Sequence, residues 1–205
     1  MRPPYPYPGG RRVIPEPKRP SDPAQVPPVR SARLDLVSLS AAFLAASLAG
    51  QTDDSAAEIG AALPPDWPGG SPPILEIRLA GLAADPYARP WLLRAMIVRT
   101  PERRLVGHVA YHGPPDSDRT VEVGYTVKPA YRRRGYASEA VAALLRWAVT
   151  EHAVVRRRAS VSPGNLASLG VIGKLEFVHT GVQWDDIDGK ELVFHLDLRD
   201  PPGPD

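Results

Sequence analysis

Cysteine is absent from the 205-residue chain, which excludes disulfide bonds, thiolate metal ligands and a cysteine nucleophile. The sequence also has no apolar run of about 18 residues, so we expect neither a membrane span nor a membrane partner. The start of the chain, Met1-Arg2-Pro3-Pro4, is not followed by the apolar segment of a secretory signal. Together these absences favour a cytoplasmic protein.

A strong excess of one charge is lacking as well. Lysine and arginine number 25 and aspartate and glutamate 23, which gives a net charge of +2. Proteins that bind nucleic acids usually carry a larger and more concentrated positive charge. Two runs of arginine stand out, at 132–134 and 156–158, but no aromatic platform accompanies them. We therefore expect no nucleic-acid partner.

Proline, by contrast, is abundant: the chain has 25, and ten of them fall among the first 30 residues. Because proline fixes φ and removes a backbone donor, such a stretch builds neither a helix nor a strand ladder. We predict a disordered N-terminal tail over residues 1–30, one folded domain over residues 31–199 and a disordered C-terminal tail over residues 200–205.

Hydrophobic periodicity divides the predicted domain into strands and helices. Alternating patterns predict strands at 33–39, 91–99, 104–112, 120–127, 156–161 and 192–198, with one more strand just before the last. Helical spacing predicts helices between Ser40 and Gly50, over 53–62, from Pro73 onward, from Gly135 to Val149 and over 165–175. This order is typical of an α+β domain with a mixed sheet of about six to seven strands and flanking helices.

The segment between the strand at 120–127 and the helix after it carries the clearest chemical signal. A helix N-terminus offers free N–H groups and a partial positive charge, which suit a pyrophosphate. Gly135 and Ala137 would let the backbone approach the phosphates closely, and Ser138 could add a hydroxyl donor. The arginines at 132–134 raise the local positive potential. The alternative is a solvated loop with ordinary turn chemistry at Gly135.

This segment resembles the signature of the GCN5-related N-acetyltransferases, the GNAT superfamily. The signature, Arg/Gln-x-x-Gly-x-Gly/Ala, is matched by Arg132, Gly135 and Ala137. A second element of the family, an asparagine followed by a helix and a Gly-Phe pair, corresponds to Asn165 and Glu176-Phe177. The resemblance covers residues 33–198 and is greatest to the ribosomal-protein serine and alanine N-acetyltransferases. It implies a GNAT fold, whose mainly antiparallel sheet splays at the cofactor site.

The resemblance implies acetyl-CoA as the acetyl donor, with no metal ion. Backbone groups of the strand through Tyr125 to Val127 would pair with the pantetheine arm, and loop amides would hold the pyrophosphate. Asn165 would contact the pantetheine arm or position the acceptor; as an alternative, it caps the helix that follows. The predicted cofactor-binding residues are Tyr125, Thr126, Val127, Arg132, Arg133, Arg134, Gly135, Tyr136, Ala137, Ser138 and Asn165.

The resemblance further implies direct transfer to a primary amine, which could be a protein N-terminus or a small molecule. The tyrosine acid that many relatives have is replaced here by Ile172, and the glutamate base of others by Ser160. Glu122 is the candidate base, because it shares a strand face with Gly124; the alternative is a cross-strand ion pair. Ser168 is the candidate proton donor for the departing thiolate.

Two groups of polar residues near the predicted site remain open to more than one interpretation. His108 and His112 lie on one strand, where a core or surface histidine is the simpler explanation. Asp185, Asp186 and Asp188 could flank a cationic acceptor, but Asp188-Gly189 is typical of a hairpin turn, which we favour.

The missing tyrosine and glutamate leave a second function open. The chain could be a catalytically silent module that binds coenzyme A and regulates another process. The oligomeric state is equally open, and a homodimer is one option.

Overall fold

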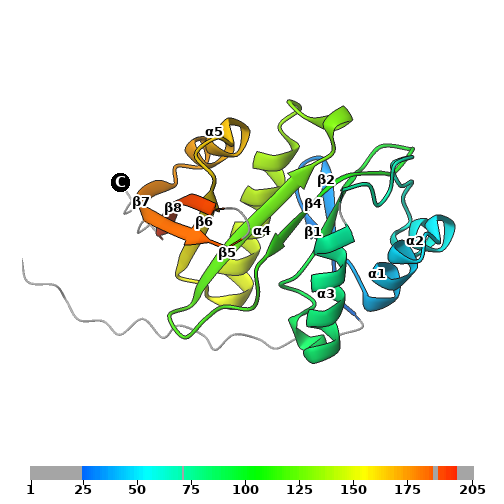
Figure 1. Cartoon of the computed structure of the whole chain (residues 1–205). Coiled ribbons are helices and arrows are strands. Elements are labelled where there is room, and N and C mark those ends of the chain that lie inside the picture. The colour runs from blue at the N-terminus through cyan, green and yellow to red at the C-terminus, as the bar shows by residue number, and fades with distance from the viewer. Residues whose placement is uncertain (1–24, 71, 187–188, 198–205) are drawn as a thin grey trace, which may run out of the picture.

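The computed structural model describes residues 25–70, 72–186 and 189–197, and these form one sheet flanked by helices (Figure 1). Within these residues the sheet has eight strands in the order β1-β2-β3-β4-β5-β6-β8-β7. The strands are β1 Val29–Arg30, β2 Leu34–Ser38, β3 Arg94–Val98, β4 Arg104–Tyr111, β5 Thr120–Val127, β6 Arg156–Val161, β7 Val178–Asp185 and β8 Gly189–Asp197. The helices are α1 Ala41–Leu48, α2 Thr52–Ile59, α3 Pro72–Ala84, α4 Tyr136–His152 and α5 Leu166–Lys174, with short 3-10 helices η1 Pro86–Ala88 and η2 Pro129–Tyr131.

The pairing of the strands confirms the predicted mixed sheet. Neighbouring strands are antiparallel throughout the described part of the chain, except for the parallel pair of β5 and β6. The α+β class and the flanking helices are as expected, and the sheet has one strand more than the upper expected number.

The helices cover both faces of the sheet, and α3 and α4 lie on opposite faces (Figure 1). The alternation of side chains along β3 explains why both faces are needed. Met96 packs into the core under α4, whereas its neighbours Ala95 and Ile97 pack into the core under α1, α2 and α3. All three side chains are fully buried. Burying a side chain of the size of Met96 or Ile97 contributes about 1.5–3 kcal/mol to stability, so both layers are required.

Two predicted boundaries in the N-terminal half were wrong. The strand predicted at 91–99 begins at Arg94, because the backbone N–H groups of Trp91 and Leu92 donate to the carbonyl of Ala88 in a turn and are not free for the ladder. The second helix ends at Ile59 and not at residue 62, because Gly60 terminates it in the left-handed conformation with φ 59°.

The N-terminal tail was also predicted to run too far. Val29 and Arg30 pair with Leu36 and Asp35 of β2, so strand β1 falls inside the range that the proline content assigned to the tail. Residues 1–24 and the predicted C-terminal tail at 200–205 lie outside the described residues.

The end of α5 carries an unusual backbone conformation. The N–H of Phe177 donates to the carbonyl of Ile172 at 3.2 Å, and the N–H of Glu176 donates to that of Gly173 at 3.1 Å. These two bonds form the Schellman motif that ends many helices, in which glycine is preferred at the position of Glu176. Glu176 has a φ of 62°, so a non-glycine residue here adopts the left-handed conformation.

We expect Glu176→Gly to stabilise the protein. Glycine removes a steric cost of about 1 kcal/mol, which corresponds to a rise in melting temperature of about 2–4 °C. Thermal unfolding followed by circular dichroism measures this change. Glu176→Ala is the matched control, because it also removes the carboxylate but keeps a side chain at positive φ. A glycine variant no more stable than the alanine variant would contradict the argument.

Candidate active site

The parallel strands β5 and β6 stay paired over a short distance only. Their register joins Thr120–Glu122 to Arg156–Arg158; beyond these residues β5 continues beside β4, and β6 continues beside β8. A cavity of about 200 Å³ lies between the diverging strands. The strand edges that face each other across it have no ladder partner within the described residues, so their N–H and C=O groups can bond to an extended ligand.

The cavity brings together residues from five elements and connections. Of the predicted site residues it includes Tyr125, Asn165 and Ser168. Its other lining residues are Val123, Gly124, Ala159, Ser160, Val161, Ser162 and Glu191.

Hydrogen bonds connect the three predicted residues in this cavity. The hydroxyl of Tyr125 donates to the carbonyl of Ser168 at 3.2 Å, which connects β5 to α5. The side chain of Asn165 accepts from the N–H of Ser168 at 3.1 Å, so the predicted N-cap role is confirmed. Burial raises the pKa of the Tyr125 phenol, which therefore stays protonated at neutral pH.

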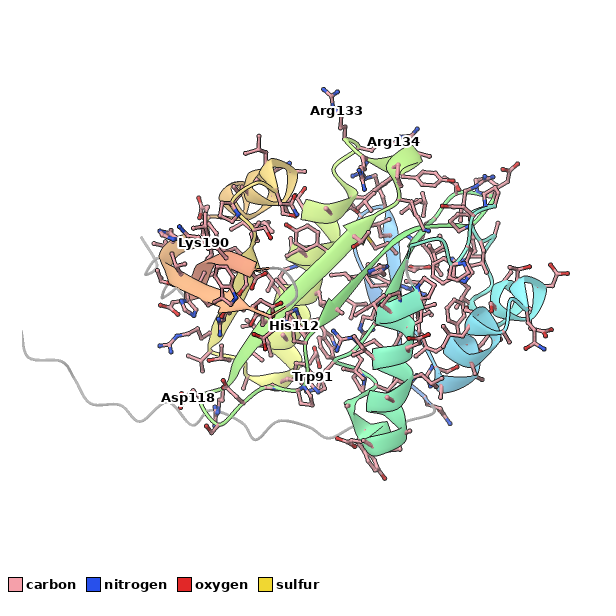
Figure 2. All side chains as sticks on the ribbon, in the orientation of Figure 1. Trp91, His112, Asp118, Arg133, Arg134 and Lys190 are labelled. Atoms are coloured by element: carbon pink, nitrogen blue, oxygen red, sulfur yellow. The ribbon has the colours of Figure 1, made fainter. Side chains whose placement is uncertain are left out.

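The basic loop follows β5, which borders the cavity, and leads into α4. Arg132 folds back and donates from Nε to the carbonyl of Val127 at 3.0 Å, and Arg133 projects outward from the loop (Figure 2). Arg134 turns the other way, with its guanidinium 5.7 Å from the ring centre of Tyr131. The three arginines are all exposed but point in three directions, and Arg133 extends away from the loop.

The backbone of the loop is shaped for exposed N–H groups. Arg133 and Gly135 both adopt positive φ, 61° and 79°. When positive and negative φ values alternate, successive backbone N–H groups point to one side and form a concave anion-binding surface, called a nest. Gly135 is the N-cap of α4 and has no side chain to occupy the first-turn amides. The Ser138 hydroxyl, predicted as a ligand donor, donates to the carbonyl of Gly135 at 3.1 Å.

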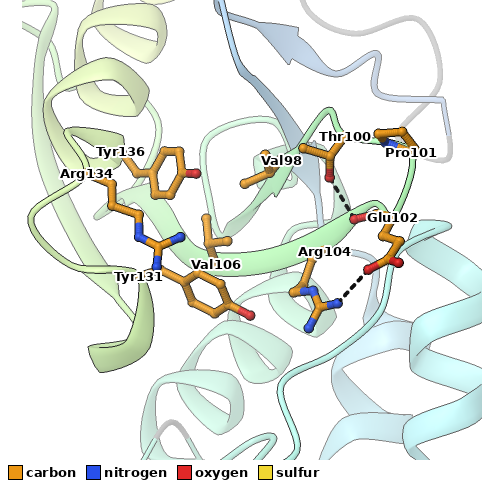
Figure 3. Close-up of a pocket in the computed structure, with 9 residues that line it drawn as sticks. All are labelled: Val98, Thr100, Pro101, Glu102, Arg104, Val106, Tyr131, Arg134 and Tyr136. Carbon is orange, nitrogen blue, oxygen red and sulfur yellow. Dashed lines mark hydrogen bonds and ion pairs between the residues drawn. The ribbon is translucent and has the colours of Figure 1, made fainter.

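A second cavity of about 320 Å³ lies beside the same loop, against the turn between β3 and β4 (Figure 3). Tyr131, Arg134 and Tyr136 form one side of it, and Thr100, Glu102 and Arg104 the other, with Val98, Pro101 and Val106 completing its lining. Tyr136, predicted to bind the cofactor, therefore lines this second cavity.

A polar network connects four strands next to the first cavity. Glu122 pairs with Arg158, its neighbour across the parallel strands, at 3.5 Å. Arg158 donates to the side-chain oxygen of Gln183 on β7. The amide nitrogen of Gln183 donates to Ser160 at 3.1 Å and to Glu191 on β8 at 2.7 Å. The ion pair that we gave as the alternative for Glu122 is therefore present.

Glu191 is the functional candidate that the sequence did not reveal. Its carboxylate lines the cavity, whereas Glu122 is not among the lining residues. Glu191 belongs to no spacing motif, and its position follows only from the register that places it opposite Gln183. The alternation of Leu192, Phe194 and Leu196 was the one available signal, because it assigns Glu191 to the opposite face.

The two histidines lie on the same side of the sheet as Gly124. A side chain at Gly124 would come within 3.3 Å of Nε2 of His112, so this ring lies against the strand that borders the cavity (Figure 2). His112 is fixed through its backbone, which accepts a hydrogen bond from Arg78 at 3.0 Å. His108 is half-buried, and desolvation, with Lys128 and Arg78 nearby, lowers its pKa to about 4.

The structure places Ile172, one of the positions where this chain departs from the family pattern, and part of the β7–β8 hairpin. Ile172 is fully buried in the core under α4 and presents no polar group to the cavity. Asp185 pairs with Gly189, which has a φ of 72°, so β7 and β8 form a hairpin, but the turn favoured at Asp188-Gly189 stays a prediction. Asp188 lies outside the described residues.

Among the residues that the structure describes, no group of three or more potential metal-binding side chains is found. None of the described helices is long and apolar enough to cross a membrane.

The strand order, the split parallel pair and the loop that leads into α4 define the acetyltransferase class of α+β folds. A family model described as acetyltransferase (GNAT) domain matches residues 75–178, just over half of the chain. The chain therefore belongs to the GNAT acetyltransferase family, as the signature predicted.

Individual relatives agree with this assignment. YjdG of Bacillus subtilis, an uncharacterized N-acetyltransferase, is 32% identical over 83 residues, which are 40% of this chain and 49% of YjdG. The chain spans about half the length of the curated relatives that it matches.

Solved structures show the same fold. A GNAT-family acetyltransferase from Bacillus anthracis aligns with a TM-score of 0.57 and 20% identity, over 82% of this chain and 97% of that one. RimL, a ribosomal L7/L12 α-N-protein acetyltransferase solved with coenzyme A, aligns with a TM-score of 0.58 and 16% identity, over 85% of this chain and 98% of RimL.

The lowered pKa of His108 predicts a dependence of stability on pH. In the unfolded chain its imidazole binds a proton below about pH 6.5, whereas in the folded protein it stays neutral down to about pH 4. The unfolded state binds more protons in this window, so stability is complete above it and falls by about 3 kcal/mol as the pH decreases through it.

Replacing His108 with glutamine should flatten this dependence. Urea denaturation at pH 7, 5.5 and 4.5 measures it in both proteins. His179→Gln is the control, because His179 is exposed and stacks on Phe194 at the far edge of the sheet. An unchanged slope in the His108 variant would show that another group is responsible.

Proposed function

We propose that this protein transfers an acetyl group from acetyl-CoA directly to a primary amine. The observation that carries the proposal is the cavity between β5 and β6, together with the amide-rich loop that connects the end of β5 to α4. An extended arm with a pyrophosphate at one end has the shape that these two features accept. A protein N-terminus and a small-molecule amine both suit the reaction, which we place in the cytoplasm.

In this proposal the cofactor is bound mainly by backbone groups. The unpaired edge of β5 from Tyr125 to Val127 would bond to the pantetheine amides in the manner of an added strand. The first-turn amides of α4, with Gly135 and Ala137 leaving space, would hold the pyrophosphate. Arg133 would supply a charge that can move to the phosphates, because it has no folded-back contact comparable to that of Arg132.

We propose Glu191 as the base that removes a proton from the ammonium group, in preference to Glu122. Glu191 lines the cavity, and its carboxylate is held in place by Gln183 at 2.7 Å. The carboxylate of Glu122 is engaged by Arg158 at 3.5 Å. The network of these side chains contains two carboxylates and one guanidinium, so it has a surplus negative charge that favours a cationic acceptor.

Two hydroxyl groups in the cavity could protonate the departing thiolate. The predicted donor, Ser168, lines the cavity, and so does Tyr125, whose hydroxyl is held by the carbonyl of Ser168. The proton affinity of a phenolate is closer to that of a thiolate than the affinity of a serine alkoxide is, so Tyr125 is the better matched acid. It would supply the function of the tyrosine that Ile172 replaces.

Ala137→Glu tests the cofactor site. A glutamate in the first turn of α4 agrees with the helix dipole and should leave the fold intact, but it places a negative charge where the pyrophosphate would bind. We expect acetyl-CoA affinity to fall at least about 100-fold in calorimetry, and Ala137→Gln, which has the same length without the charge, to lose much less. Equal affinities in the two variants would refute the assigned position of the pyrophosphate.

Glu191→Gln tests the chemistry. With acetyl-CoA and a panel of amines, release of free thiol should show a kcat reduced by about 100-fold or more, with little change in the affinity for acetyl-CoA. Glu122→Gln is the comparison, and we expect a smaller effect from it. The opposite ranking would move the base to Glu122. Binding of acetyl-CoA by the unmodified protein without turnover of any amine would favour a catalytically silent coenzyme-A-binding module.

A further inference from the structure

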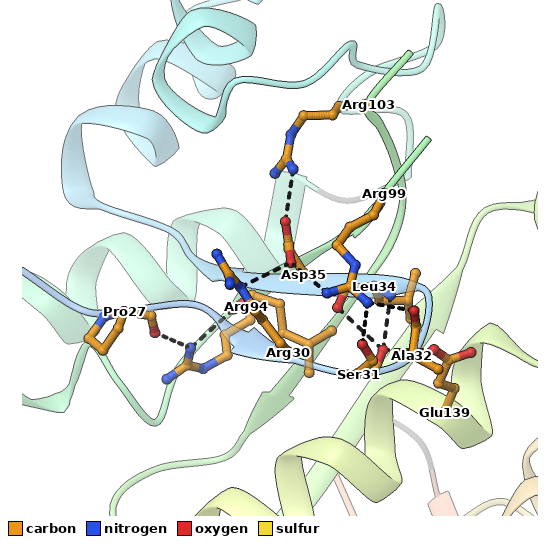
Figure 4. Close-up of polar contacts among 11 residues, drawn as sticks. Pro27, Arg30, Ser31, Ala32, Leu34, Asp35, Arg94, Arg99, Arg103 and Glu139 are labelled. Atoms are coloured by element: carbon orange, nitrogen blue, oxygen red, sulfur yellow. Dashed lines mark hydrogen bonds and ion pairs between the residues drawn. The ribbon is translucent and has the colours of Figure 1, made fainter. Parts of the chain in front are cut away.

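The turn between β1 and β2 lies against the first turn of α4, and one carboxylate joins them (Figure 4). Glu139 accepts hydrogen bonds from the hydroxyl of Ser31 at 2.7 Å, from the backbone N–H of Arg33 at 2.6 Å and from Nε of Arg33 at 2.7 Å. An ion pair between Nη2 of Arg33 and the same carboxylate, at 2.6 Å, completes the contact. Both oxygens of Glu139 are thus engaged by the turn.

Arg33 also reaches the basic loop directly. Its Nη2 donates to the carbonyl of Arg134 at 3.0 Å, and its guanidinium lies 4.8 Å from the ring centre of Tyr136. A side chain at Gly135 would meet the same nitrogen at 3.4 Å. One guanidinium therefore contacts a residue before Gly135, the residue after it, and Glu139 one turn further along α4.

The contact with Arg134 determines how the loop presents its amides. The carbonyl of Arg134 and the N–H of Gly135 belong to one planar trans peptide, so they point in opposite directions. Because the carbonyl is turned toward Arg33, the N–H of Gly135 faces away from the β1–β2 turn, and Gly135 is exposed. A rotated peptide would present a carbonyl oxygen there and repel a phosphate.

Residues that follow strand β3 hold the β1–β2 turn in place. Arg99, which follows β3, donates its backbone N–H to the carbonyl of Arg33 at 2.9 Å and its guanidinium to the carbonyl of Ser31 at 2.6 Å (Figure 4). The buried carboxylate of Asp35 on β2 pairs with Arg103 at 2.8 Å, which secures the same corner of the sheet. The contacts of Arg33 with the loop therefore start from a rigid base.

Glu139 would be unfavourable in this position without its partner. It lies in the first turn of α4, next to the amides that we assign to the pyrophosphate, where an uncompensated carboxylate would repel the cofactor. Arg33 balances that charge and directs both Glu139 oxygens toward the turn.

We propose that Arg33 and Glu139 are positioning residues that hold the loop before α4 in its phosphate-binding conformation. The inference rests on the proposed function, since it assumes that the loop binds the pyrophosphate of acetyl-CoA. The hairpin of β1 and β2 contributes no lining residue to the cavity between β5 and β6. The proposal nevertheless gives this hairpin an effect on the affinity for the cofactor.

Arg33→Lys tests the proposal. Lysine keeps the charge but cannot bond to Glu139 and to the carbonyl of Arg134 with one planar group. Calorimetry measures the affinities of the full-length protein for coenzyme A and, by displacement, for pantetheine, which lacks the pyrophosphate. We expect the affinity for coenzyme A to fall about ten-fold, as for the loss of one charge-assisted hydrogen bond, and the affinity for pantetheine to stay unchanged.

Two further variants complete the experiment. Arg156→Lys is the matched control, because Arg156 has the same side-chain exposure as Arg33, 49%, and also pairs with one carboxylate, Asp197. It should change neither affinity. Glu139→Asp keeps the charge but shortens the side chain, which weakens its contacts with Ser31 and Arg33, and should give the same selective loss as Arg33→Lys.

Each outcome has a distinct meaning. Unchanged affinity for coenzyme A in both Arg33→Lys and Glu139→Asp would overturn the positioning role, and so would an equal loss for pantetheine, which would indicate general distortion. If the unmodified protein binds no coenzyme A at all, the proposed function is wrong, and the positioning role falls with it.

Discussion

The split between β5 and β6 is the constraint on which the rest of this structure depends. Two parallel strands need a long crossover connection, and here α4 provides it. The helix starts near the ends of the strands where β5 and β6 separate. The cavity and the N-terminus of α4 consequently lie toward the same end of these strands. A ladder that continued past Glu122 and Arg158 would close the cavity and leave the loop before α4 with nothing beside it.

The sheet can open between β5 and β6 because each of these strands is hydrogen-bonded to another strand on its other side. β5 pairs with β4 at five positions, from Tyr111–Val123 to Gly107–Val127, and β6 pairs with β8 at six. The gap is then bridged at its rim by the hydroxyl of Tyr125, which reaches α5, and beneath it by the network through Arg158 and Gln183. These contacts hold the two strands apart on either side of the cavity.

The sequence predicted what depends on local pattern and missed what depends on distant partners. The order of strands and helices and the loop around Gly135 follow from periodicity and from a contiguous signature. Strand β1 was missed because Val29 and Arg30 lie among prolines, and only their pairing with β2 orders them. Arg33 and Glu139 are 106 positions apart, and no spacing rule connects them. Arg94 is a comparable case: a fully buried arginine inside an apolar strand, satisfied by the carbonyls of Pro90 and Leu36, which only the folded chain brings near.

The same distinction separates the two halves of the proposed reaction. Backbone groups would bind acetyl-CoA, the acetyl donor. Such contacts require glycine and other small residues at fixed spacing, which can be recognised in the sequence. Side chains on β5, β6, β7 and β8 would receive the acceptor, and these can change without altering the sheet, because they alternate with the core residues that hold it. The carboxylate of Glu191 fits the same logic: it is fixed by its cross-strand neighbour Gln183, so its position depends on the register of two strands and not on any local motif.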